Sequence, residues 1–383
     1  MRDRLDIVVA GGGPVGAALA LALRESGLSV ALVEPRQADQ GASAAAPFRP
    51  IALSHASRLV LERIGMFGSL PVTPIRTVHI SQAGGFGRTL IHAYELNVPA
   101  LGYVTDLAPL AGSLLAAAAP EHIASRVTAW DDAGDSVRVR LAGDGERVLV
   151  TRLLVLADGG LAAADDLSLR DYGQTAIVAP VRPERVAHHT AFERFTAEGP
   201  AALLPFADRY ALIWSVRTSR VPELMRSPDA GFLDQISGLF GRRFGDFTEV
   251  GTRAGYPLVL RFRRTTALGP RTVAVGNAAQ TLHPVAGQGL NLGLRDAAEL
   301  AQAILGAGQS ALESGELATR FAAQRRRDRY ASIGITEGLV RAFGSDRPFA
   351  RALRGAGLLA LDLAPPARRL LARRFVFGLR ALP

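Results

Sequence analysis

The residues best suited to chemistry are the glycines between positions 11 and 16, which are spaced as G-x-G-x-x-G. Gly11 permits a tight turn, Gly13 lets the backbone approach a pyrophosphate, and Gly16 allows a helix to pack closely on a strand. Glu34 follows about 20 residues later, where a carboxylate can accept hydrogen bonds from ribose hydroxyls. The spacing therefore predicts a site for a nucleotide that carries a pyrophosphate.

The elements around this turn form a β–turn–α–β pattern. Residues 5–10 are a short apolar run typical of a strand, and residues 17–26 have a helical pattern that ends at Gly27. A second strand at residues 29–33 leads into Glu34, whose carboxylate disfavours a 2′-phosphate. The pattern predicts bound FAD or NAD rather than NADP; the alternative is a glycine-rich turn in an ordinary α/β sheet.

A second glycine-rich stretch spans residues 276–296 and follows a short predicted strand. It begins with Gly276-Asn277 and continues through Pro284 to a helix that opens near Gly289. The positive end of a helix dipole stabilises negative charge, and glycines there let backbone N–H groups approach a ligand. The stretch has no set of metal ligands, so we expect no metal.

The middle of the chain is predicted to be mostly sheet. Residues 125–157 alternate as an antiparallel meander with a hairpin turn at Asp144-Gly145, and they lead into Asp158. Apolar runs within residues 171–264 predict a separate sheet, with helix expected over residues 222–244. Arg49 follows the second strand, where a cation suits a phosphate or the edge of an isoalloxazine ring but is equally typical of a protein surface.

Together these motifs resemble the FAD-dependent aromatic hydroxylases of the p-hydroxybenzoate hydroxylase fold. Within them, the chain is most similar to the ubiquinone-biosynthesis hydroxylases, especially the 2-polyprenyl-6-methoxyphenol hydroxylase branch. The resemblance covers nearly the whole chain and rests on residues 11–34, 49–57, 101–104, 157–159, 171–176, 191–205, 256–258, 276–296 and 335–341. Asn277 and Gln280 stand where the wider fold class usually has Asp and His, and Asp158 lacks the Ser and Arg that often follow it. The Asn and Gln resemble the methoxyphenol branch.

The resemblance implies how the cofactor is held. It assigns the ADP end of FAD to the first glycine turn, and the ribityl and pyrophosphate groups to the start of the second glycine-rich stretch. The isoalloxazine ring would border the residues that follow, and two further side chains would lie beside the cofactor. The expected cofactor-binding residues are Gly11, Gly13, Pro14, Gly16, Glu34, Arg49, Asp158, Gly276, Asn277, Pro284, Gly287, Gly289, Leu290 and Asn291.

The chemistry of the family has two halves. NAD(P)H reduces the flavin as a transient co-substrate, and reduced flavin reacts with O2 to give a C4a-hydroperoxyflavin that hydroxylates an electron-rich phenol. The resemblance thus implies an FAD-dependent monooxygenase that hydroxylates the ring of a polyprenyl phenol in ubiquinone biosynthesis. Three alternatives stay open: a monooxygenase of the same fold acting on a soluble phenol, a relative that reduces prenyl double bonds, and a non-catalytic flavin-bound scaffold of a biosynthetic complex.

The acid–base residues are not assigned by these motifs. His283 either assists deprotonation of the phenol or is structural beside Pro284, and Tyr256 either contacts substrate or packs in the core. We expect no metal at His188-His189, because adjacent strand residues point to opposite faces. The Arg-rich run at residues 325–329 is expected to be a solvated helix face.

These patterns predict an α/β fold with an inserted α+β part. A Rossmann-like FAD-binding domain of the glutathione reductase type would be interleaved with a mostly antiparallel substrate-domain sheet and followed by a helical C-terminal end. The FAD-binding domain would comprise residues 1–170 and 266–345, with part of the substrate sheet inserted near residues 70–105. Residues 171–265 would form the substrate-binding sheet, and residues 346–383 a basic helical segment.

The composition limits the possible functions. The 383 residues include no cysteine, which excludes disulfides and thiolate metal sites and fits a reducing compartment. All 44 basic residues are arginines, and the net charge of +9 is concentrated in residues 351–383. This basic, partly apolar end would bind a membrane surface or another ubiquinone-biosynthesis protein, or would pack on the body with its arginines outward. We expect no nucleic-acid partner, and a cytoplasmic location that is either free or peripheral at the inner face of the membrane.

Overall fold

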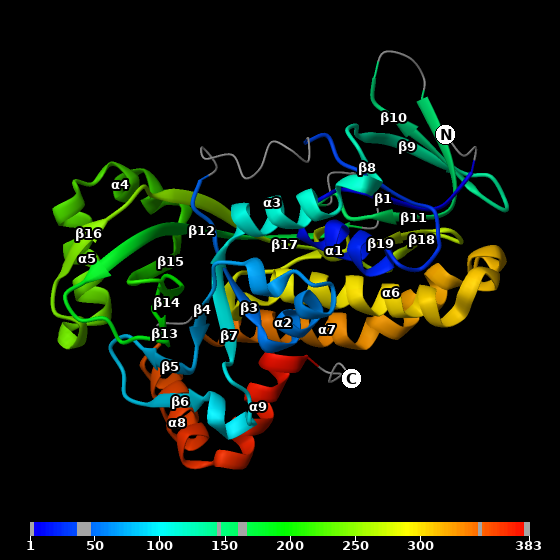
Figure 1. Ribbon diagram of the computed structural model, residues 1–383. Coiled ribbons are helices and arrows are strands. Elements are labelled where there is room, and N and C mark those ends of the chain that lie inside the picture. Colours follow the sequence, from blue (N-terminus) through cyan, green and yellow to red (C-terminus); the bar gives the residue numbers. More distant parts are fainter. Residues whose placement is uncertain (1–3, 37–46, 144–146, 160–166, 344–346, 379–383) are drawn as a thin grey trace.

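A computed structural model describes residues 4–36, 47–143, 147–159, 167–343 and 347–378 (Figure 1). It contains two large sheets with helices packed around them, and the predicted α/β fold is confirmed. The hairpin turn expected at Asp144-Gly145 lies outside the described residues. No helix within the described ranges is long and apolar enough to cross a membrane.

The first sheet holds the N-terminal glycine turn. Its strands run in the order β18-β19-β11-β1-β2-β8, and a hairpin of β9 and β10 extends from β11. The pairs between β19, β11, β1, β2 and β8 are parallel. The strand bounds are Leu5–Ala10 (β1), Val30–Val33 (β2), His122–Ile123 (β8), Val127–Asp132 (β9), Val137–Leu141 (β10), Arg147–Leu156 (β11), Ala267–Gly269 (β18) and Thr272–Ala274 (β19).

The register of this sheet brings distant motifs to one edge. Ala10 at the end of β1 lies opposite Val33 of β2 and Leu156 of β11, and Leu156 lies opposite Ala274 of β19. The segments that leave these four strands therefore begin side by side. In open α/β sheets, ligands bind in the crevice outside the carboxyl ends of the strands.

Four helices pack around the first sheet: α1 (Pro14–Leu23), α3 (Leu107–Ala117), α6 (Gln288–Ser314) and α7 (Leu317–Phe343). They share one apolar core with strands β1 and β11. Helix α1 begins three residues earlier than the predicted start at residue 17, because Pro14 occupies the first turn, where its missing N–H costs nothing. The turn after β1 therefore passes directly into the helix.

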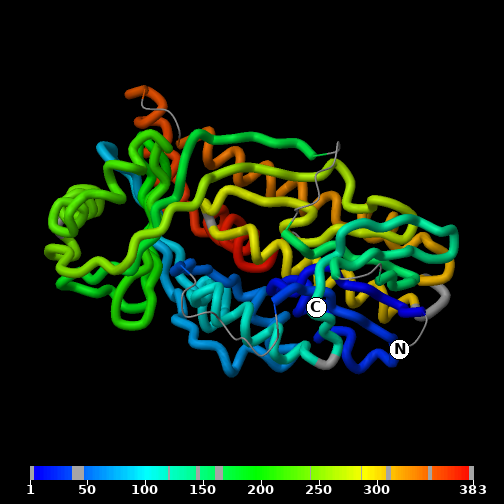
Figure 2. The backbone as a smooth tube through the Cα atoms, turned by 90° about the horizontal axis from the view of Figure 1, so that it is seen from above, coloured from blue at the N-terminus to red at the C-terminus, as the bar shows by residue number. Residues whose placement is uncertain are grey.

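The second sheet is mostly antiparallel, in the order β20-β17-β12-β15-β14-β13-β5-β6, with β16 beside β12. In Figure 2, β12 is the long green strand that connects the two halves of the molecule. Strands β5 and β6 come from residues 77–92, and β5 pairs in parallel with β13. The strand bounds are Thr77–Gln82 (β5), Arg88–His92 (β6), Leu167–Pro183 (β12), Thr190–Phe195 (β13), Pro200–Phe206 (β14), Arg209–Arg217 (β15), Phe247–Val250 (β16), Ala254–Arg263 (β17) and Gln280–Thr281 (β20).

Helices α4 (Val221–Arg226) and α5 (Asp229–Phe240) cover one face of the second sheet (Figure 1). The helical structure predicted for residues 222–244 is present, but it is divided between two helices, because the chain breaks at Ser227-Pro228. Proline lacks a donor N–H and disfavours helical geometry at the residue before it. The opposite face of the sheet is therefore left to the rest of the molecule.

A small sheet and two C-terminal helices complete the fold. The small sheet has the order β3-β7-β4, and α2 follows β3 directly. Helices α8 and α9 lie against β6, as Figure 1 shows at its lower edge. The bounds are Pro50–Ser54 (β3), His55–Arg63 (α2), Thr73–Ile75 (β4), Gly102–Asp106 (β7), Pro348–Leu363 (α8) and Pro365–Phe377 (α9).

The basic C-terminal segment packs on the body through both apolar and polar contacts. Ala372 and Val376 of α9 are buried in a cluster with residues of β6 and the turn after it. The Thr89 hydroxyl donates to the Leu358 carbonyl of α8 at 2.7 Å, and Arg368 pairs with Glu95 at 3.0 Å. The alternative in which this end packs on the protein is thus observed.

Helices α6 and α7 are joined by buried charges. Arg325 is only 1% exposed, and its guanidinium contacts Asp296 at 2.9 Å, Glu299 at 2.5 Å and Asp328 at 2.9 Å. Although burial opposes the charged form, these carboxylates raise the pKa of Arg325 above its ordinary value. The expectation that residues 325–329 form a solvated helix face is wrong for Arg325, Asp328 and Arg329, which are buried against α6 and the segment before it. It holds for Arg326 and Arg327, which are exposed.

Replacing Arg325 by methionine should lower the free energy of unfolding by about 3–5 kcal/mol, because the buried carboxylates of Asp296 and Glu299 lose their cation, whereas Asp328 keeps Arg295. Urea unfolding followed by circular dichroism would measure the change. The matched control is Arg326→Met on the exposed face of α7, for which we expect a change within about 0.5 kcal/mol. Equal stability of the two variants would contradict this account of the cluster.

Candidate functional site

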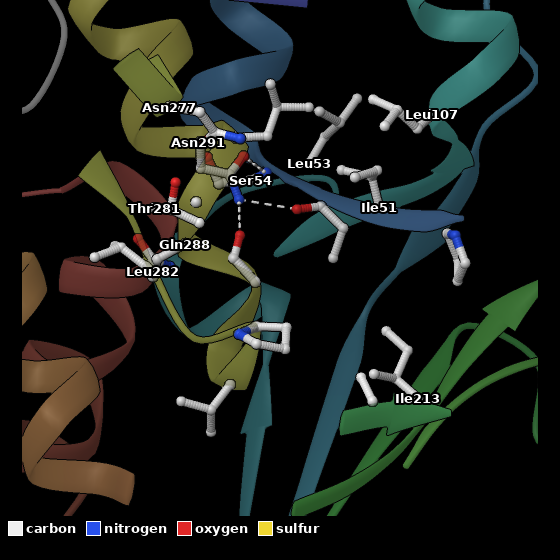
Figure 3. A pocket seen from close by; sticks show the side chains of 18 of the residues that line it. Ile51, Leu53, Ser54, Leu107, Ile213, Asn277, Thr281, Leu282, Gln288 and Asn291 are labelled. Carbon is white, nitrogen blue, oxygen red and sulfur yellow. Dashed lines mark hydrogen bonds between the residues drawn. The ribbon is translucent and has the colours of Figure 1, made fainter. Parts of the chain in front are cut away.

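A cavity of about 1410 Å³ begins at the carboxyl edge of the first sheet and continues across the second sheet to the C-terminal helices. Its first part is lined by the glycine turn after β1 and by Glu34. Its middle is lined by β3 and by the segment that opens α6, seen at close range in Figure 3. Its far part is lined by β12 to β15, β5 and α7 to α9. The predicted cofactor residues thus lie along one continuous space, except Gly16 and Gly276, which do not line it.

In the first glycine turn, neighbouring backbone segments lie too close together for side chains at some positions. A Cβ atom at Gly16 would lie 1.9 Å from the Gly11 carbonyl oxygen, and one at Gly11, where φ is +109°, would lie 2.6 Å from the backbone of Ala157. At Gly13, by contrast, an added Cβ would meet no atom within 4 Å. Gly11 and Gly16 serve packing, and Gly13 leaves room at the start of α1 for a ligand.

Glu34 is held in place at the end of β2. It is buried, its Oε2 accepts a 2.7 Å hydrogen bond from the Gly12 N–H, and its Oε1 accepts one of 2.7 Å from Arg36 Nε. Burial alone would raise the pKa of this carboxyl, but the contacts with Arg36 and Gly12 lower it below its ordinary value. Glu34 is therefore an ionised acceptor that lines the cavity.

The loop after β19 forms a second glycine turn. Gly276 has φ of +58°, and its N–H donates to Asp296 Oδ2 of α6 at 3.2 Å. The same oxygen accepts a 2.8 Å bond from Gln280 Nε2, and Gln280 Oε1 accepts one of 2.6 Å from Arg329. Asn277 is exposed and lines the cavity. Gln280, one of the two departures from the wider fold class, thus has a structural part in fixing this loop.

The start of α6 is tied to β3 and α2 by a single side chain. Asn291 Oδ1 accepts from the Ser54 N–H at 2.8 Å and from the Ser57 hydroxyl at 2.6 Å. Its Nδ2 donates to the carbonyls of Ala52 and Gly287, at 2.8 and 2.6 Å. Figure 3 shows this amide beside Ser54 at the cavity wall. With its side chain committed to protein partners, Asn291 leaves its backbone to face a ligand.

The residues before Asn291 leave the first turn of α6 open. Gly287 adopts a left-handed conformation with φ of +60°, and a Cβ at Gly289 would meet no atom within 4 Å. Both glycines line the cavity together with Pro284 and Leu290. The first N–H groups of a helix have no partner within the helix and favour negative charge. This turn could therefore receive the polar edge of a ring.

Arg49, Asp158 and Tyr256 also line the cavity. The Arg49 guanidinium lies 5.1 Å from the centre of the Tyr256 ring, whose hydroxyl donates to the Phe48 carbonyl at 3.3 Å. Burial raises the pKa of Tyr256 above its ordinary value. The structure therefore places Tyr256 in the cavity wall, with its hydroxyl held by the backbone.

His283 has a different environment. It is fully buried, its Nδ1 accepts from the Val285 N–H at 3.1 Å, and its ring packs edge-on to Tyr172. Burial lowers the pKa of His283 to about 4, so the ring is neutral at pH 7. Leu282 and Pro284 on either side line the cavity, but the imidazole is enclosed by protein. This geometry favours the structural alternative for His283.

The far part of the cavity contains residues that the motifs did not single out. Its walls are mostly apolar side chains of the second sheet and of α7, α8 and α9. Glu193 of β13 is an exception, because it is a carboxyl on this apolar face. An acid that alternates with Ala191 and Phe195 on one face of the strand was the available signal. Among the described residues, no group of three or more acidic or histidine side chains is arranged to hold a metal ion.

The two ends of the site fit FAD. Gly13 offers space for a pyrophosphate at a helix N-terminus, and Glu34 offers an ionised acceptor for ribose hydroxyls. Asn277 lies between these groups and the open turn of α6, where the isoalloxazine ring would rest near Gly289. When bound there, FAD supplies the redox chemistry with O2. The chain's part is to hold the ring and exclude water around it.

The contrast between two glycines tests this assignment. We expect Gly13→Ala to fold and to bind FAD at least about tenfold more weakly, because the added methyl group occupies the space of the pyrophosphate. Gly16→Ala should not give folded protein, because its Cβ meets the Gly11 carbonyl. Circular dichroism and titration of the apoprotein with FAD measure the two effects. Undiminished FAD affinity in Gly13→Ala would contradict the placement of the pyrophosphate.

Comparison with known proteins agrees with this geometry. The family model described as FAD dependent oxidoreductase matches residues 6–47, which contain the first glycine turn and Glu34. The chain is 33% identical to ubiquinone hydroxylase UbiL of Rhodospirillum rubrum, and the match covers 99% of this chain and 91% of that protein. It is 28% identical to 3-demethoxyubiquinol 3-hydroxylase of Escherichia coli, over 98% of each chain.

The fold is also found in solved structures. The p-nitrophenol 4-monooxygenase PnpA of Pseudomonas putida superposes with a TM-score of 0.75 at 18% identity, covering 99% of this chain and 100% of that one. This likeness concerns the fold alone, whereas the full-length match to UbiL concerns the family. The glycine turns left FAD or NAD open, and FAD, the cofactor that the resemblance implied, is confirmed. The chain belongs to the FAD-dependent hydroxylases of ubiquinone biosynthesis.

Proposed function

We propose that this protein hydroxylates the aromatic ring of a polyprenyl phenol on the route to ubiquinone. The relatives named above are ubiquinone hydroxylases, which supports a substrate of this class. NAD(P)H would reduce the flavin as a transient co-substrate, since no second G-x-G-x-x-G motif occurs in the chain, and O2 would supply the oxygen. The methoxyphenol branch stays a prediction, because neither relative bears that name.

The observation that carries the proposal is the apolar far part of the cavity. Beyond the isoalloxazine end, the space continues between the second sheet and the helices α7, α8 and α9. The helix residues that line it are mostly apolar, among them Leu339, Leu358, Leu361, Leu371 and Val376. A soluble phenol would leave these walls in contact with water. An isoprenoid tail would fill this part and remove apolar surface from water.

The surface of α8 and α9 supports contact with a membrane. We define the α8–α9 surface as the exposed apolar residues Phe349, Leu353, Leu359, Leu363 and Leu370, with the arginines at 369, 373 and 374. Phe349 is 80% exposed and Leu363 is 74% exposed, which is unusual for large apolar side chains. Apolar residues beside arginines are typical of helices that lie on anionic lipid. The same two helices line the cavity from within, so a lipid-soluble substrate would meet the protein here.

The substrate proposal is tested by turnover of the holoenzyme. NAD(P)H-dependent O2 consumption should rise with a short-chain prenylated phenol, and 18O from O2 should enter the product. Leu371→Glu in the cavity wall should raise KM for the prenylated phenol by about tenfold but not KM for a phenol without a tail, because only the tail reaches α9. The matched control is Ala367→Glu on the exposed side of α9.

Two results would contradict the proposal. Tight coupling with tail-free phenols, at equal kcat/KM, would favour the monooxygenase of soluble phenols. Failure of NAD(P)H to reduce the bound flavin would favour the non-catalytic scaffold.

Membrane contact is tested by flotation with vesicles. The protein should float with vesicles that contain phosphatidylglycerol and less with pure phosphatidylcholine, because the arginines need an anionic surface. The triple variant Phe349→Ser, Leu353→Ser, Leu363→Ser should remain in the lower fraction. The control Leu169→Ser, at an exposed leucine of β12, should float like the wild type. Flotation of the triple variant would remove the α8–α9 surface from the proposal.

A further inference from the structure

Glu193 lies in the apolar part of the cavity, and its carboxyl has no protein partner in the part of the chain that the structure describes. It lies on β13, where it is opposite Ala202 of β14 and Ile80 of β5. Both neighbours line the cavity and are apolar. None of the hydrogen bonds or ion pairs found among the described residues involves the Glu193 side chain. Its remaining surface therefore faces the space that a substrate would enter.

The strand pattern aims this carboxyl at the cavity. Residues alternate between the two faces of a strand, so Ala191, Glu193 and Phe195 share one face, and all three line the cavity. On the other face, Phe192 packs in the core beneath α5, although it also borders the cavity, and Arg194 points the same way as Phe192 and does not line the cavity. The cation next in sequence is thus on the far side of the sheet and does not neutralise Glu193.

An unpaired carboxyl in an apolar cavity is expected to form a hydrogen bond with a bound ligand. Buried polar groups in native proteins are almost always hydrogen-bonded, and one left open in a cavity is completed by what the cavity binds. Burial raises the pKa of Glu193 to about 8, so the group carries its proton at pH 7. A neutral carboxylic acid can both donate and accept a hydrogen bond. A phenolic hydroxyl donates one hydrogen bond and accepts another, so a neutral carboxylic acid can form both hydrogen bonds with it.

Several other polar side chains of the cavity are engaged elsewhere or lie at its nucleotide end. The Tyr256 hydroxyl already donates to the Phe48 carbonyl, and the Asn291 amide is held by four protein groups. Glu34 and Asp158 lie at the edge of the first sheet, at the nucleotide end. Glu193 is therefore the acid of the lining that belongs to the second sheet, where the aromatic ring would lie.

We propose that the Glu193 carboxyl binds the hydroxyl group of the substrate's aromatic ring and so positions the ring carbon that is hydroxylated. The proposal rests on the proposed function and deepens it. The apolar walls around Glu193 select the rest of the ring and its tail, and Glu193 selects a ring that carries a hydroxyl. Because a single polar contact in an apolar pocket fixes rotation of the ring, Glu193 determines specificity as well as affinity.

The test pairs a change in the protein with a change in the ligand. A short-chain prenylated phenol and its analogue with hydrogen in place of the hydroxyl are titrated into the holoenzyme, and the flavin absorbance reports binding. The wild type should bind the phenol about tenfold or more tightly than the analogue. In Glu193→Leu this ratio should fall to about one, because the phenol loses affinity and the analogue does not.

Two further variants make the result specific. Glu193→Gln keeps hydrogen-bonding capacity and should retain a preference for the phenol over the analogue. If Glu193→Leu does not take up FAD, Glu193→Gln still tests the proposal. Glu249→Leu removes a carboxyl from β16 of the same sheet, outside the cavity lining, and should bind both ligands as the wild type does. With the natural substrate, Glu193→Leu should also form hydroxylated product at altered ring positions.

The outcomes separate this proposal from the proposed function. If the wild type turns over prenylated phenols but binds the phenol and its analogue equally, the role of Glu193 is overturned and the function stands. The same holds if Glu193→Leu keeps the wild-type ratio. If no prenylated phenol stimulates O2 consumption by the wild type, the proposed function fails and the role of Glu193 fails with it.

Discussion

The structure depends on charge buried between α6 and α7. Arg325 of α7 is enclosed with Asp296, Glu299 and Asp328, and Arg295 of α6 also pairs with Asp328. Removing one partner of such a buried group leaves charge uncompensated. Asp296 also accepts the Gly276 N–H and the Gln280 amide. One carboxylate therefore connects the packing of two long helices with the loop that lies beneath the cofactor. A protein whose cations are all arginines is suited to this arrangement, because a guanidinium can serve several oxygens at once.

A single side chain also connects distant segments at the start of α6. Asn291 ties the first turn of this helix to β3 and α2, which lie about 240 residues earlier in the chain. Through this amide, the first turn of α6 is held against β3 and α2 at the cavity wall, where the N-terminus of a helix favours negative charge. The cavity thus has a polar, fixed nucleotide half and an apolar half. In the second half, Glu193 is the carboxyl that the second sheet contributes.

The sequence predicted those parts of the site that are local. The spacing of apolar residues and of three glycines predicted the strand, the glycine turn and the helix between Leu5 and Leu23. Burial of Arg325 was missed because its partners Asp296 and Glu299 lie on another helix, and an arginine-rich run alone has the pattern of a surface. Glu193 was passed over because a carboxyl in a strand is informative only once the register shows which face it shares.

The site is formed by segments that the ribosome synthesises at widely separated times. Gly13 emerges early, Gly276 follows more than 250 residues later, and α9, which lines the far part of the cavity, comes near the C-terminus. At a synthesis rate of about 5–20 residues per second, roughly 13–50 seconds separate the first turn from the second. Until then the nascent chain presents half a binding site. FAD can be bound at both ends only after Gly276 and the start of α6 have been synthesised.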